Sequence, residues 1–131
     1  MSIKHSVSLE TFAERHYSKS FAKKYGRAWD ITIEAVLWEL QDFDLLLTRS
    51  IAEIIVAKDK IKICKVEFKV AGTPYSRHAS GNRCIVAWHQ DCALVKILLI
   101  YHKNDLSSKN ETATWKNLIK ENYLEYRDLI K

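Results

Sequence analysis

Four segments between residues 51 and 102 place apolar side chains at nearly every second position, which is the spacing of β-strands. They cover residues 51–57, 61–70, 83–89 and 93–102, and turn-like residues separate them. The last two segments are apolar on both faces, which is typical of strands in the middle of a sheet. The sequence therefore predicts four antiparallel strands, with the last two in central positions.

Helical periodicity flanks these strands on both sides. Tyr17, Phe21 and Tyr25 are four residues apart with lysines between them, which predicts a short basic helix that Gly26 ends or bends. Residues 28–47 carry the strongest apolar stripe of helical spacing, and residues 111–131 carry another.

Before the first helix, residues 7–15 alternate loosely and predict a short strand. The resulting order predicts an α+β domain in which an N-terminal strand and a helical pair pack on a twisted antiparallel sheet, with a C-terminal helix. The length of 131 residues suggests that residues 1–131 form a single domain.

Composition narrows the classes of function. The net charge is +5, from 21 lysines and arginines against 16 acidic residues, which favours a polyanionic partner. No run reaches membrane-spanning length and the N-terminus lacks the apolar core of a signal peptide, so we expect a cytoplasmic protein without a membrane partner. Cys64, Cys84 and Cys92 lie in or beside strands, which favours reduced, buried thiols. The sequence shows no Gly-rich phosphate loop, nucleophile elbow or convincing metal-ligand pair, so we expect no cofactor and no metal.

Polar residues gather where the predicted central strands begin and end. Arg77 and His78 precede a strand that Arg83 begins, and its partner strand ends in His102 and Lys103. A neighbouring strand carries three charged residues on one face, which are Lys65, Glu67 and Lys69.

This combination of side chains suits the cleavage of an RNA phosphodiester. Arginine binds phosphate oxygens and stabilises developing negative charge. His102 could donate a proton to the leaving 5′ oxygen, while Glu67 or a lysine accepts the proton of the 2′-OH. Such a reaction leaves a 2′,3′-cyclic phosphate, needs no metal, and spares DNA because DNA lacks the hydroxyl.

Strand register decides whether Arg83 and His102 can act together. If Gln90 and Asp91 form a two-residue turn, Arg83 lies opposite Leu98 and His102 shares its face. A change of one residue in the turn places Tyr101 there instead, and the sequence leaves both registers open. Simpler interpretations also remain, because Arg77, His78 and Lys103 could be solvated charges and Glu67 part of a surface charge ladder. We expect His78 to be a bystander.

The stretch YSRHASGNRCIVAWHQDCALVKILLIYHK resembles the RelE/ParE toxin superfamily, in particular its RelE-like and YoeB-like mRNA interferases. The resemblance rests on Tyr75-Ser76-Arg77, on Arg83 at the start of a strand, and on Tyr101-His102-Lys103 at the end of the next. It covers about Lys65 to Lys103 and implies a RelE-like fold. Two departures are Lys103, where close relatives often have Tyr, and the additional C-terminal helix, which is either packed on the domain or a partner face.

The resemblance implies a toxin of a type II toxin-antitoxin system, which cleaves mRNA, in some members on the ribosome, and is neutralised by a cognate antitoxin. By position, Arg83 resembles the transition-state arginine, His102 the terminal acid and Glu67 a catalytic carboxylate. The predicted phosphate- or RNA-binding residues are Arg77, Lys65, Lys69 and Lys103.

Two alternative functions remain open. The first is a gyrase-inhibiting toxin of the ParE type without catalysis. The second is a basic nucleic-acid-binding domain that stacks bases on Trp88 or Tyr101.

Overall fold

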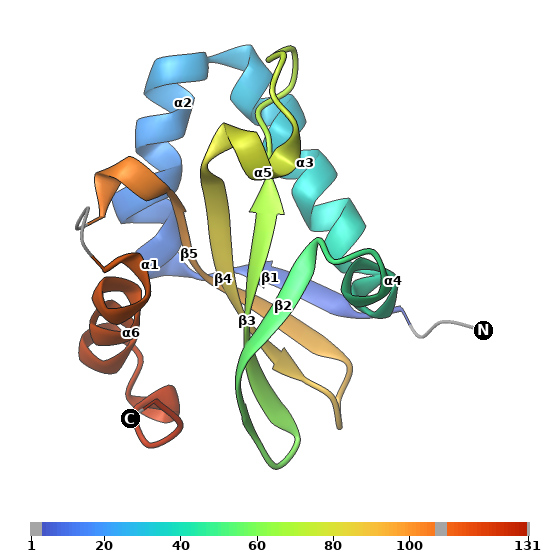
Figure 1. The fold of residues 1–131 in the computed structure, drawn as a ribbon, viewed down its shortest axis with the longest axis vertical. Helices are drawn as coiled ribbons and strands as arrows, with labels where there is room; N and C mark the ends of the chain where they lie inside the picture. Colours follow the sequence, from blue (N-terminus) through green and yellow to red (C-terminus); the bar gives the residue numbers. More distant parts are fainter. Residues whose placement is uncertain (1–3, 107–109, 131) are drawn as a thin grey trace.

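A computed structural model describes residues 4–106 and 110–130 of the chain and shows an α+β fold built on one five-stranded mixed sheet (Figure 1). The strand order is β1-β5-β4-β3-β2. The strands are β1 Ser6–Leu9, β2 Ala52–Lys58, β3 Ile61–Phe68, β4 Asn82–His89 and β5 Leu94–His102. β2 to β5 pair antiparallel as predicted, whereas β1 runs parallel to β5, a pairing that the sequence pattern did not predict.

The predicted helices are present with different boundaries, and the structure adds the short helices α1 and α5. They are α1 Thr11–Ala13, a π-helical turn Glu14–Ser18, α2 Lys19–Tyr25, α3 Arg27–Leu40, α4 Phe43–Thr48, α5 Arg77–Ser80 and α6 Glu111–Asn122. Single 3₁₀ turns follow β5 at Lys103–Asp105 and α6 at Leu124–Tyr126. Gly26, with φ of +57°, separates α2 from α3 and so confirms the predicted bend.

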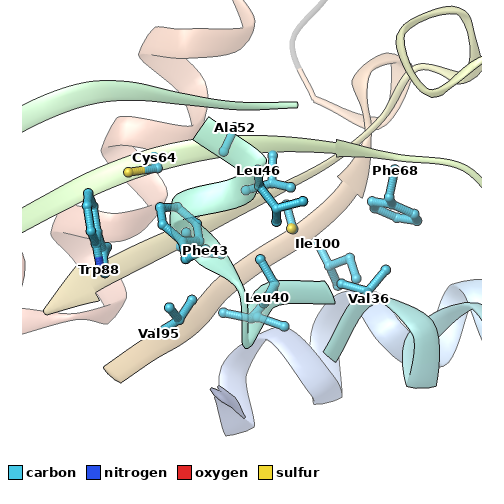
Figure 2. Close-up of a cluster of buried hydrophobic side chains, with 14 of the residues drawn as sticks. Val36, Leu40, Phe43, Leu46, Ala52, Cys64, Phe68, Trp88, Val95 and Ile100 are labelled. Atoms are coloured by element: carbon cyan, nitrogen blue, oxygen red, sulfur yellow. The ribbon is translucent and has the colours of Figure 1, made fainter. Parts of the chain in front are cut away.

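Two apolar layers hold helices against opposite faces of the sheet. On the first face, α2, α3 and α4 pack over Cys64, Val86 and Trp88. Figure 2 shows Phe43 and Leu46 of α4 on the same side of the sheet as Cys64 and Trp88. On the second face, Trp115 and Ile119 of α6 are fully buried against β3, β4 and β5. Residues from both central strands contribute to both layers, which confirms that β4 and β5 are central.

Three predicted boundaries were wrong. The first strand ends at Leu9 rather than near residue 15, because Phe12 and Ala13 already lie in a helix packed beside β5. The long helical stripe of residues 28–47 is broken at Gln41 and Asp42 into α3 and α4. The final helix ends at Asn122, and Tyr126 and Ile130 reach the core from a 3₁₀ turn and the segment after it.

The cysteines divide into two environments. Cys64 and Cys84 are buried free thiols, and desolvation raises the pKa of each to about 12. Cys92 is exposed in the β4–β5 turn, so the expectation of a buried thiol was wrong there. In the described part of the chain, no helix combines the length and the apolar character that crossing a membrane requires.

Candidate functional site

The register of β4 and β5 places Arg83 and His102 on opposite faces of the sheet. Arg83 pairs with Tyr101, and Asn82 pairs with His102. Directly paired residues share a face and successive residues alternate, so Arg83 and His102 lie at one end of the sheet but point to different sides. Of the two registers that the sequence leaves open, the structure has the one in which Tyr101 rather than His102 shares the face of Arg83. The connecting turn spans residues 90–93, and an irregularity between Ile85 and Val86 shifts the ladder once more.

Arg83 instead joins four side chains on the face that α6 covers, and together we call these five residues the carboxylate cluster. Its members are Glu67, His78, Arg83, Tyr101 and Glu111. Glu67, Arg83 and Tyr101 form one row across β3, β4 and β5. The Arg83 guanidinium lies 3.3 Å from the Glu67 carboxylate, and its Nε lies 4.0 Å from Glu111.

Arg83 is at the buried centre of this cluster. Its side chain is 6% exposed, and the side chains of Glu67 and Glu111 are 18% and 27% exposed. The guanidinium also donates to the carbonyl of Asn82 at 3.2 Å, while its Nε makes no hydrogen bond within the described residues. Neutralising carboxylates satisfy the need of a buried cation for a partner. Arg83 is thus placed to hold the two carboxylates, with little surface left for direct contact with a ligand.

Tyr101 connects the row to the C-terminal helix. Its hydroxyl donates to Glu111 Oε2 at 2.7 Å, at the first residue of α6. Burial and this hydrogen bond to a carboxylate raise the pKa of Tyr101 well above its usual value, so the hydroxyl stays protonated. Because the ring is 1% exposed, Tyr101 cannot stack with a base in this conformation, and the same holds for Trp88 at 6%. The expectation that either residue offers a stacking surface was wrong.

His78 forms the exposed edge of the carboxylate cluster. Its Nδ1 lies 2.6 Å from Glu67 Oε2, and its side chain is 84% exposed. The short helix α5 positions it, and Ser76 caps this helix by accepting the N–H of Ala79 at 3.1 Å. Since a carboxylate accepts, Nδ1 carries the proton, and in the neutral ring Nε2 is a free acceptor facing solvent.

A histidine that donates one ring N–H to a carboxylate and exposes its other ring nitrogen to solvent is suited to proton transfer. The prediction that His78 is a bystander did not foresee this contact with Glu67.

The other predicted binding residues lie apart from one another in the structure. Arg77 turns away from the cluster and forms a 2.6 Å ion pair with Glu39 of α3. Lys65 shares the face of Glu67 and lies 3.9 Å from Glu53 on β2. Lys69 is exposed beyond the end of β3.

His102 and Lys103 lie on the other side of the sheet end. Both line a cavity together with Lys24 and Tyr25 of α2. Apart from Arg77 and Lys69, the candidate residues therefore form two separate groups, one around Glu67 and one around His102.

The carboxylate cluster offers acid–base groups and a buried cation. Within residues 4–106 and 110–130, no group of three or more His, Cys, Asp or Glu side chains is arranged to hold a metal ion. Sequence reasoning missed Glu111, because the start of α6 is remote from the strands in sequence and no local pattern marks a helix residue that reaches a strand end. Its pairing with Tyr101 depends on tertiary packing alone.

Comparison with known proteins gave no match: no protein-family model, no curated protein and no solved structure is significantly similar to the chain.

Proposed function

We propose that the chain is a toxin of the RelE/ParE type that cleaves mRNA as a metal-independent endoribonuclease. The proposal combines the resemblance of residues 65–103 to the mRNA interferases with the geometry of the carboxylate cluster. The observation that carries it is the 2.6 Å contact between His78 and Glu67, next to the buried guanidinium of Arg83. A RelE-like fold is part of the proposal, and the order of a strand, helices and four antiparallel strands supports it.

In the proposed reaction, His78 Nε2 accepts the proton of the substrate 2′-OH while Glu67 stabilises the imidazolium that forms. The 2′ oxygen attacks the adjacent phosphorus, and the bond from phosphorus to the 5′ oxygen breaks. The 5′ oxygen takes up a proton, which the imidazolium can return. The products are a 2′,3′-cyclic phosphate and a 5′-hydroxyl end, so atoms and charge balance without a cofactor.

Arg83 acts as a positioning residue in this scheme. By neutralising Glu67 from the buried side, it fixes the carboxylate that orients His78. Lys65 lies two residues from Glu67 on the same face of β3 and supplies positive charge beside the scissile phosphate. These roles replace the expected pairing of Arg83 with His102 by a pairing of His78 with Glu67.

The proposed partners follow from the resemblance. They are mRNA, engaged free or on the ribosome, and a cognate antitoxin that blocks the site. We also propose that the protein acts in the cytoplasm, where both partners are present.

The test is cleavage of a defined transcript by purified protein, with the new ends mapped, together with growth after induced expression. His78→Ala and Glu67→Gln are each expected to lower the cleavage rate by about 10²-fold or more, the usual contribution of acid–base catalysis. Lys58→Ala, which changes an exposed residue at the other end of β2, serves as the matched control and should retain the wild-type rate. Wild-type cleavage by His78→Ala would show that the acid–base assignment is wrong.

A second candidate function is nucleic-acid binding without cleavage. The burial of Arg83 between two carboxylates favours it, because an arginine that does not reach the phosphate cannot stabilise the charge of a transition state. Intact transcripts, unchanged growth and salt-sensitive binding of RNA would support this candidate over the nuclease.

A further inference from the structure

Two adjoining cavities lie between α2 and the ends of β4 and β5, with volumes of about 350 and 360 Å³. Four residues line both cavities, namely Lys24, Tyr25, Asn82 and His102. We call this combined space the strand-end groove. Asn82 and His102 are register partners, so these two residues lie on the face of the sheet opposite to Arg83. Each cavity is of a size that accommodates a small ligand.

The unpaired side-chain oxygen of Asn82 is the observation that indicates a ligand site. It is 4% exposed, and its side-chain Oδ1 has no hydrogen-bond partner among the described residues. Its backbone N–H is held by Ser80 Oγ at 3.1 Å, so the residue is fixed in place. A buried acceptor without a donor is costly, and in native proteins such a group usually has a functional explanation. A ligand N–H or O–H that enters the groove supplies the missing donor.

The remaining walls of the groove combine cations with aromatic rings. Lys24 and Lys103 bring positive charge, and Lys24 Nζ lies 5.3 Å from the centre of the Tyr25 ring. Tyr75, at 55% exposed, stands at the rim of the second cavity. A carboxylate, that of Asp105, lines the first cavity and can accept from a ligand hydroxyl or amine. Lysines bind phosphate and aromatic rings stack on bases, which is the usual composition of sites for single-stranded nucleic acid.

His102 lies at the junction of the two cavities. Its Nδ1 accepts the N–H of Asn104 at 3.1 Å, which leaves Nε2 as the protonated nitrogen of the neutral ring. The ring packs against Gly81, where a Cβ would stand 2.7 Å from Nε2. Gly81 also has φ of +76°, which favours glycine. The close approach of strand and turn therefore fixes the position of the His102 ring in the groove wall.

We propose that the strand-end groove binds one unstacked nucleotide of a single-stranded nucleic acid. An N–H on the edge of the base donates to Asn82 Oδ1, Tyr25 or Tyr75 stacks on the base, and Lys24 and Lys103 contact the phosphates. The proposal is independent of RNA cleavage, because no residue of the carboxylate cluster other than Tyr101 lines these cavities, and the hydroxyl of Tyr101 binds Glu111.

The test is fluorescence anisotropy of the full chain with a labelled 2′-O-methyl RNA hexamer. This probe lacks the 2′-OH nucleophile, so binding is measured without cleavage and the outcome does not depend on nuclease activity. A DNA hexamer of the same sequence, measured in parallel, identifies the sugar that the groove prefers. Competition by AMP that exceeds competition by inorganic phosphate at equal concentration also supports a site for a whole nucleotide, whereas equal competition overturns it.

Asn82→Leu is the decisive variant. It removes the acceptor at similar volume, and binding of the hexamer should weaken by about tenfold or more, as expected for loss of a base contact. The urea midpoint of the variant should stay the same or rise, because Oδ1 has no partner to lose. Unchanged binding by Asn82→Leu overturns the proposal, as does a fall in the urea midpoint that accompanies the weaker binding.

The lysines provide an independent second measurement. Lys24→Ala and Lys103→Ala should each weaken binding and reduce its salt dependence, because each removes a phosphate contact. Lys58→Ala, exposed at the far end of β2, is the control for general charge. If Lys58→Ala weakens binding as much as Lys24→Ala, the attraction is diffuse and the groove is not the site.

Discussion

Replacing Arg83 by methionine should destabilise the fold, because Arg83 is the buried cation between two carboxylates. Its side chain is 6% exposed and lies 3.3 Å from Glu67 and 4.0 Å from Glu111. Removing one partner of a buried ion pair costs about 3–5 kcal/mol. Both carboxylates retain some contact with solvent, so we expect a loss of about 3 kcal/mol in the free energy of unfolding. The melting temperature should fall by roughly 10 °C.

Urea unfolding followed by tryptophan fluorescence measures this loss, since Trp29 and Trp115 are buried in the two apolar layers. The double variant Arg83→Met/Glu67→Gln should recover part of the stability, with a coupling free energy of about 1 kcal/mol or more. Arg49→Met, at an exposed position after α4, is the matched control and should change stability by no more than about 0.5 kcal/mol. A wild-type urea midpoint for Arg83→Met, or a loss that does not depend on Glu67, would refute this account of the cluster.

Two further substitutions test α6 and its link to the sheet. Asn110→Ala removes the acceptor that caps α6 at the N–H of Ala113 and should lower the free energy of unfolding by about 1 kcal/mol, measured by thermal unfolding. Asn110→Asp keeps the capping oxygen and is the control. Equal losses of stability in the two variants would contradict the capping role. Tyr101 has a raised pKa in the folded state, so its contribution to stability is present below the unfolded pKa and is lost as the pH rises above about 10. Tyr101→Phe should therefore lose less stability than the wild type in urea unfolding between about pH 9 and 11, and an unchanged slope would contradict this linkage.

The strands were predictable from the sequence because their side chains obey a simple rule. A two-residue period from Ile51 to His102 reflects burial on alternate faces, and continuous apolar character in β4 and β5 reflects burial on both. Helical spacing revealed α2, α3 and α6 for the same reason. The parallel pairing of β1 with β5 had no such signal, because four residues beside a distant strand leave no mark on the local period.

The register at the ends of β4 and β5 could not be predicted from the sequence. The face of His102 relative to Arg83 depends on the number of residues in one turn and on one irregularity in the ladder. The period of two specifies neither number. A shift of one residue separates a predicted catalytic pair into two groups on opposite faces.

The contact of His78 is a second feature that the local sequence does not reveal. It follows the turn at residues 71–76, where a lone histidine is most simply a solvated side chain, and α5 is too short to leave a helical pattern. Its contact with Glu67 arises from the way β3 and α5 meet at the sheet end. The residues of the cluster were therefore present in the sequence, but their grouping belongs to the fold.

The two buried thiols and the exposed one allow the opening of the core to be measured. Cys92 lies in the turn at the end of the sheet remote from Arg83 and His102, so a thiol-reactive dye attaches there without disturbing either group. Cys64 and Cys84 lie under the helices of the first face, and the high pKa of each keeps the thiol unreactive until the core opens. The rate at which Cys64 and Cys84 react with the dye then measures how often α3 and α4 separate from the sheet.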